Sequence, residues 1–108
     1  MSPKQLRDIT GDSQHVRLSD LVGEVILLVA AERAESRQYG RGVRLEFRRW
    51  DEEAGKPHSE LCDAFSVAPG VCRPIGRLLA ASGDGEAWAD PEGVVCEVVM
   101  AGAGIALV

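Results

Sequence analysis

The chain has 108 residues, of which 45% are hydrophobic and 27% are charged, and its formal net charge is −5. This length predicts one domain with a single modest core, and the composition is that of an ordinary soluble globular protein. The negative charge argues against a protein that binds nucleic acid over its whole surface. The longest apolar run, Val25–Ala31, is far shorter than the roughly 18 residues of a membrane span, so we expect no membrane partner.

The three cysteines, Cys62, Cys72 and Cys96, show no paired spacing, and no apolar signal-peptide core precedes them. We therefore expect free thiols in a reducing cytoplasm. Neither these cysteines nor His15 and His58 have the spacing of a structural zinc site. The sequence also lacks a nucleophile elbow, a phosphate loop and a dinucleotide fingerprint. We expect no metal, no cofactor and no enzymatic activity.

In chain order, residues 1–17 are polar and unpatterned, which predicts a flexible N-terminal lead-in to a domain over residues 18–108. Leu18–Gly23 predicts a short helical or tight turn. Glu24–Glu35 begins with β-branched residues and continues almost uninterrupted as an apolar run, which favours a long and mostly buried strand. Periodicity alone does not exclude a helix there. Residues 36–42 supply the turn that follows.

The second strand has the clearest pattern in the chain. Val43, Leu45 and Phe47 alternate with polar residues, which is typical of a strand with one buried face. The same alternation places Arg44, Arg48 and Trp50 together on the other face.

A third strand is expected over His58–Ala68, with Leu61, Phe65 and Val67 facing inward and Asp63 on the same face. In that register Asp63 requires either a bulge or hydrogen bonds to its carboxylate.

A helix is expected after Pro69-Gly70, because four apolar residues there share one helical face: Val71, Ile75, Leu78 and Leu79. Since Pro74 is tolerated only in a first turn, the helix should begin near Cys72 or Arg73, and Ser82-Gly83 should end it. An acidic loop over residues 84–93 follows. Val94–Ala101 and Ile105–Val108 predict a closing hairpin of two strands.

Three strands, a helix and two strands are the layout of the OB-fold, a five-stranded Greek-key barrel. We therefore predict a mainly β fold, with one helix between strands 3 and 4. An SH3-like small barrel and a generic α+β sandwich are the alternatives.

The chain resembles the small OB-fold single-stranded DNA-binding proteins of bacteriophages and their bacterial relatives. Four segments carry the resemblance: Leu18–Val29, Glu35–Phe47, Phe65–Ala80 and Gly104–Val108. It spans roughly residues 18–108, and its motifs are turns and alternation rather than a catalytic signature. It implies binding of single-stranded DNA with little sequence preference. Because one domain with few aromatic residues should bind weakly, we expect oligomerisation or cooperative binding to help.

The residues themselves indicate where such binding would occur. Residues 33–49 contain six arginines and only two acids, within an otherwise acidic chain. Guanidinium groups beside aromatic rings are the parts from which single-stranded nucleic-acid sites are built. The predicted contacts with nucleic acid are Arg37, Tyr39, Arg41, Arg44, Arg48 and Trp50.

Three other interpretations of this surface remain open. The arginines of the second strand can form an ordinary solvated face, paired with Glu46 or with acids on a neighbouring strand. The same Arg and Trp residues can dock an acidic protein partner. The domain can also be a structural component of a larger assembly such as a phage particle. Trp88, in the acidic segment, is expected to be a packing residue or part of a protein contact.

Overall fold

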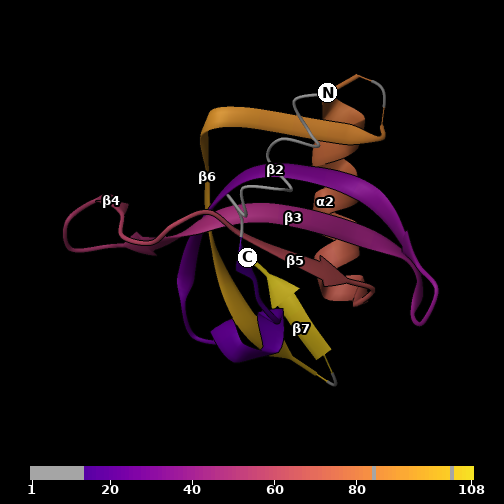
Figure 1. The fold of residues 1–108 in the computed structure, drawn as a ribbon, viewed down its shortest axis with the longest axis horizontal. Coiled ribbons are helices and arrows are strands. Elements are labelled where there is room, and N and C mark those ends of the chain that lie inside the picture. The colour runs from indigo at the N-terminus through magenta and orange to yellow at the C-terminus, as the bar shows by residue number, and fades with distance from the viewer. Residues whose placement is uncertain (1–13, 84, 103) are drawn as a thin grey trace.

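The computed structural model describes residues 14–83, 85–102 and 104–108, and Figure 1 shows their arrangement. In chain order the elements are β1 (Gln14–His15), the 3-10 helix η1 (Leu18–Leu21), β2 (Val25–Ser36), β3 (Gly40–Asp51), β4 (Lys56–Pro57), β5 (Cys62–Ser66), α2 (Pro69–Ala81), β6 (Ala87–Ala101) and β7 (Gly104–Leu107).

Strand β2 lies at the centre of the sheet and pairs antiparallel with β3 on one side and β6 on the other. Strands β5 and β7 extend the sheet antiparallel beyond β3 and β6, and the short β1 adds to β5 in parallel. Strand β4 pairs with the end of β3. Among the described residues the order β1-β5-β3-β2-β6-β7 is an open path, with no ladder that joins its two ends.

The predicted mainly β fold, with a helix between the third and fourth long strands, is therefore confirmed. The closed barrel of five strands is not found. Two short strands, β1 and β4, add to the predicted five, and the path stays open within the described part of the chain.

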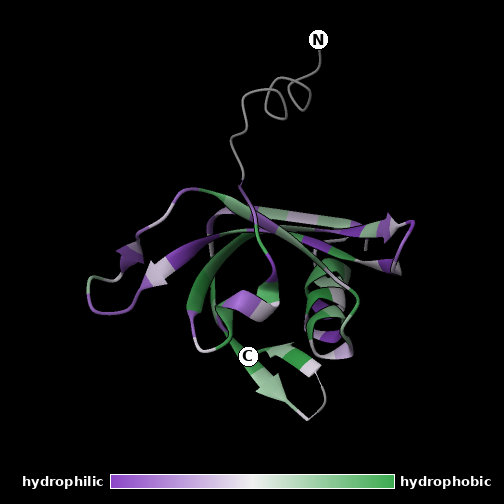
Figure 2. Cartoon of the chain, turned by 60° about the horizontal axis from the view of Figure 1, so that its bottom comes forward, coloured by the Kyte–Doolittle hydropathy of each residue, from purple (hydrophilic) through white to green (hydrophobic). Residues whose placement is uncertain are grey.

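The core lies between the inner face of the sheet and the helix. Val43, Leu45 and Phe47 of β3 are buried, as their alternation predicts. Helix α2 buries Val71 and Ile75 against them, together with Leu79. Figure 2 shows apolar segments in the interior, whereas hydrophilic residues gather at the two protruding ends of the long hairpins.

The predicted register of the third strand is wrong by one residue. Cys62 and Ala64 face the core, whereas Phe65 is half-buried and Val67 is exposed. The reason lies in the neighbouring strand, because directly paired residues share a face of the sheet. Bulky β3 residues stand opposite Cys62 and Ala64, so small side chains fit there. Asp63 consequently points to the outer face, not inward.

Helix α2 begins at Pro69, earlier than predicted, and contains Pro74 in its interior. The carbonyl of Ala68 accepts hydrogen bonds from the backbone N–H groups of Val71 and Cys72, at 3.0 and 2.8 Å, which closes the first turn. Proline at the first helical position is favourable because its fixed φ suits the helix. Pro74 removes only one further donor, and the helix continues past it to Ala81.

The expected acidic loop over residues 84–93 is in part a strand. Residues 87–89 already belong to β6 and pair with β2. Trp88 stands opposite Ala31 and packs against the core, which confirms its predicted packing role. The chain then turns a corner over residues 90–93 and pairs again with β2 from Val94 onward. Figure 1 shows this corner as a sharp bend in β6.

Most of the predicted lead-in, residues 1–13, lies outside the described residues. Its last part belongs to the fold, since Gln14 and His15 pair with Cys62 and Asp63 of β5. In the described part of the chain, no helix is both long enough and apolar enough to cross a membrane.

Candidate nucleic-acid interface

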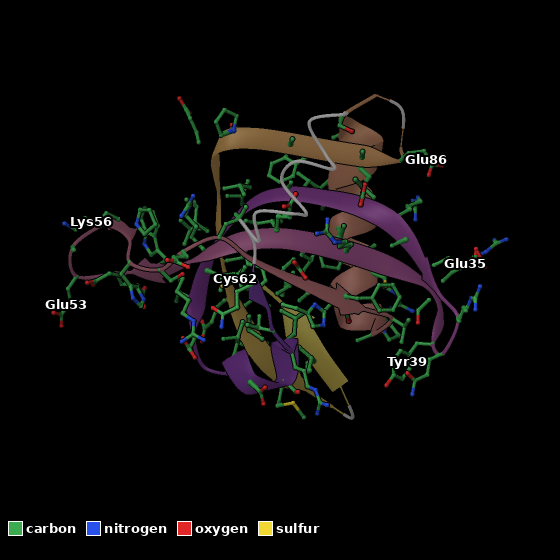
Figure 3. All side chains as sticks on the ribbon, viewed as in Figure 1. Glu35, Tyr39, Glu53, Lys56, Cys62 and Glu86 are labelled. Atoms are coloured by element: carbon green, nitrogen blue, oxygen red, sulfur yellow. The ribbon has the colours of Figure 1, made fainter. Side chains whose placement is uncertain are left out.

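The tip of the β2–β3 hairpin, residues 35–41, carries three of the six predicted contacts: Arg37, Tyr39 and Arg41. The hydroxyl of Ser36 accepts hydrogen bonds from the backbone N–H groups of Gln38 and Tyr39, both at 3.2 Å, which fixes the turn. Gly40 has a φ of +83°, a backbone conformation that glycine adopts without strain. The turn thus holds Tyr39 in solvent, 62% exposed, at one end of the molecule (Figure 3).

No ion pair is found for Arg37 or Arg41 among the described residues. Glu35 lies opposite Arg41 in the ladder, so the two arginines of the hairpin tip outnumber its acid. The hairpin tip is therefore the part of the predicted basic surface where cation and ring stand exposed together.

The middle of the outer face is different, because Arg44 is held by two carboxylates. Its guanidinium lies 3.7 Å from Glu32 on β2 and 3.5 Å from Asp63 on β5. Asp63 also lies 2.7 Å from the imidazole of His15 on β1. Arg44 is only 28% exposed, so it links three strands and offers little charge to a ligand.

Arg48 and Trp50 lie farther along β3. The Arg48 guanidinium donates a hydrogen bond of 3.2 Å to the carbonyl of Ser59, which ties it to the segment before β5. Trp50 stands opposite Pro57 of β4, and both Arg48 and Trp50 are half-buried. Glu46, between Arg44 and Arg48 on this face, is buried.

The six predicted residues therefore do not form one compact basic patch. Three lie on the exposed hairpin tip, two (Arg44 and Arg48) lie beside acids in the centre of the face, and Trp50 lies at the opposite end of β3. Trp50 stands eleven positions after Tyr39, which is about 35 Å along a strand. In the centre, Glu32, Glu46 and Asp63 outnumber the two arginines. This matches the open interpretation in which strand arginines pair with acids of neighbouring strands.

Sequence reasoning missed Glu32 and Asp63 as the partners of Arg44. The first was available from the turn: Ser36 pairs with Gly40, so counting back along both strands puts Glu32 opposite Arg44. The second required the correct register of β5, which the alternation of that strand does not reveal.

Comparisons with known protein families, with curated proteins and with solved structures found no match. Within residues 14–83, 85–102 and 104–108, no group of three or more His, Cys, Asp or Glu side chains is placed to hold a metal ion.

All three cysteines are free thiols. Burial raises the pKa of the Cys72 thiol, and the nearby Arg33 opposes that shift. Burial alone raises the pKa of Cys96 from 9.0 to about 11. Both thiols are therefore protonated near neutral pH, a state with low nucleophilic and metal-binding reactivity.

The raised pKa of Cys96 predicts a pH dependence of stability. The folded protein keeps this proton to a higher pH than the unfolded chain, so the contribution is complete below about pH 9 and is lost as the pH rises through about 11. We expect Cys96→Ala to reduce the fall in unfolding free energy across this window. Urea denaturation of both proteins at several pH values measures it. An equal fall in the two proteins would contradict the assignment.

Proposed function

We propose that this chain is an OB-like domain of the cytoplasm that binds single-stranded DNA with little sequence preference, mainly through the hairpin tip. The observation that carries the proposal is the exposed Tyr39 between Arg37 and Arg41. A flat ring stacks on any base, and flanking guanidinium groups neutralise phosphates. Such a site binds nucleic acid without base-specific contacts.

The arrangement of the strands supports the same proposal. In an OB-fold, the first strand pairs with the second and fourth, the third with the second, and the fifth with the fourth, and a pairing of the third with the fifth closes the barrel. Strands β2, β3, β5, β6 and β7 make the first four of these pairings but, within the described residues, not the closing one, and α2 lies between the third and fourth of them. OB-folds bind oligonucleotides across strands 2 and 3, beside the loop that joins strands 1 and 2. That loop corresponds to the hairpin tip.

Within this proposal the six predicted residues have different roles. Arg37, Tyr39 and Arg41 contact the nucleic acid first. Arg48 and Trp50 lie farther along β3 and contribute less, because both are half-buried and Trp50 stands among the acids at the far end of the strand. Arg44 is a positioning residue that holds β3 to its neighbours through Glu32 and Asp63. One exposed ring and two exposed arginines imply weak binding by a single domain.

Anisotropy of a labelled oligo-dT tests this proposal. We expect Tyr39→Ala to weaken binding by about 5- to 150-fold, which corresponds to the roughly 1–3 kcal/mol of one base–ring stack. Arg37→Ala with Arg41→Ala should lower the slope of log K against log salt by about 0.7 for each phosphate that is no longer neutralised.

The matched control removes two exposed arginines from the outer side of helix α2, by Arg73→Ala with Arg77→Ala. This double variant should bind oligo-dT as the wild type does. An equal loss in both double variants would mean that only overall charge matters. Undetectable binding by the wild type at low salt would overturn the proposed function.

A protein-interaction module is the second candidate, and the ion-paired Arg44 favours it. An outer face on which carboxylates balance arginines attracts nucleic acid weakly, yet suits a protein partner that carries both charges. The length of the oligonucleotide separates the two candidates. Binding to DNA should strengthen as oligo-dT grows through about 4–16 nucleotides, the site size of one OB-fold.

A further inference from the structure

A shallow hollow of about 420 Å³ lies at the opposite end of β3 from the hairpin tip. Trp50 lines it together with four acidic residues: Glu24, Asp51, Glu52 and Glu53. We call it the acidic hollow. It lies beside the turn that joins β3 to β4, at the end of the molecule where Figure 3 labels Glu53 and Lys56.

Two of the four carboxylates are already engaged within the chain. Asp51 accepts hydrogen bonds from the backbone N–H groups of Glu53 and Ala54, at 3.0 and 3.1 Å. Glu24 lies 3.8 Å from the guanidinium of Arg49. Glu52 and Glu53 are exposed, and no ion pair is found for either within the described residues.

The acidic hollow therefore combines a half-buried tryptophan with two exposed carboxylates. A guanidinium is attracted to both, since it stacks on the ring and pairs with carboxylate oxygens. Arg49 pairs with Glu24, Lys56 lies opposite Asp51, and His58 also lines the hollow. The four acids outnumber the Arg and Lys side chains, so the charge of the hollow remains negative. Its chemistry fits an arginine side chain from another molecule.

The same chain carries a complementary group at its other end. The hairpin tip presents Arg37 and Arg41 beside Tyr39, which is 62% exposed. Figure 3 labels Tyr39 at one end and Glu53 at the other, along a molecule whose longest extent is 42 Å. The two surfaces cannot meet within one molecule. They can meet between two.

We infer that copies of this chain associate head to tail, with the hairpin tip of one copy seated in the acidic hollow of the next. Arg37 or Arg41 stacks on Trp50 of the neighbour and pairs with Glu52 or Glu53. The two contacting surfaces differ, so the interface is heterologous, and each added copy exposes a new hollow and a new tip. Association grows into a chain or a ring and does not stop at a dimer.

Sedimentation equilibrium without nucleic acid tests this inference with two double variants. In the tip variant, Arg37→Gln and Arg41→Gln remove the cations, and in the hollow variant, Glu52→Gln and Glu53→Gln remove the acids. All four side chains are exposed, so the fold should persist, as circular dichroism can check. At low salt we expect each variant alone to associate at least about tenfold more weakly than the wild type.

An equimolar mixture of the two variants gives the most specific result. The hollow variant keeps an intact tip and the tip variant keeps an intact hollow, so one productive contact remains. We expect a 1:1 heterodimer that grows no further, whereas the wild type forms species larger than a dimer. The matched control, Arg73→Gln with Arg77→Gln on α2, should associate as the wild type does.

Three results would overturn the inference. The first is a wild type that stays monomeric at low salt and high concentration. The second is a wild type that stops at a dimer, which indicates a two-fold interface. The third is a mixture that behaves as the sum of its separate variants.

Discussion

Replacing Phe47 with alanine is expected to lower the free energy of unfolding by about 3–5 kcal/mol. The ring is fully buried, at 0% exposure, in the core between the sheet and α2. Its removal loses the transfer free energy of the ring and leaves a cavity that the paired strands cannot fill completely. Since small domains are stable by only about 5–15 kcal/mol, the loss takes a large part of the total. Urea denaturation followed by circular dichroism measures it.

Phe65→Ala is the control for this prediction. Phe65 lies on β5, where the alternation of the sequence points it inward, but the structure places it half-buried on the other face. We therefore expect a distinctly smaller loss of stability than for Phe47→Ala. Equal losses from the two substitutions would contradict the register of β5.

These two phenylalanines show why one strand was predictable and the other was not. From Val43 to Arg48 of β3 every second residue is apolar and those between are charged, so the sequence indicates one apolar face. Along β5, Cys62, Ala64 and Phe65 put apolar atoms on both faces. The bulky β3 residues opposite determine which face of β5 points to the core, and that information lies outside the sequence of the strand itself.

The candidate site was also predictable only in part. The turn and the alternation together locate the hairpin tip, and Arg37, Tyr39 and Arg41 are exposed there as expected. The charge available to a ligand at Arg44 was not predictable from composition. It depends on Glu32 and Asp63, which come from two different strands and meet Arg44 only through the pairing of the sheet.

The distribution of charge along β3 links the two proposals. A count of arginines in the sequence indicates one basic face. In the structure, ion pairs with Glu32 and Asp63 neutralise Arg44 at its centre, so one end of β3 is cationic and the other is anionic. Both the proposed binding of DNA and the proposed self-association use the cationic hairpin tip. Single-stranded DNA should therefore compete with head-to-tail association, and each end can be altered separately.

The corner in β6 lay beyond prediction from the sequence, because the signal there is ambiguous. Asp90, Pro91, Glu92 and Gly93 have the composition of a loop, and they do interrupt the ladder. They do not end the strand, since β2 pairs with β6 on both sides of them. The chain returns to the ladder at Val94, directly after Gly93, whose φ is +75°. Glycine at such a bulge allows a strand to change direction sharply.

Gly93→Ala is expected to be strongly destabilising for two separate reasons. An alanine at this positive φ is strained, which costs about 1–3 kcal/mol. Its Cβ would also lie 2.7 Å from the carbonyl oxygen of Leu28 and 2.9 Å from side-chain carbons of Leu27. Because a backbone atom of the central strand has to move, this close approach adds about 1–3 kcal/mol.

Gly55→Ala separates the two reasons, because Gly55 has a similar φ of +64° but nothing within 4 Å of its added Cβ. It should incur the strain alone, so the difference between the two unfolding free energies measures the close approach of β6 to Leu28. If the two substitutions cost the same, β6 does not pass this close to β2 at Gly93. The corner would then depend on the backbone conformation of Gly93 alone.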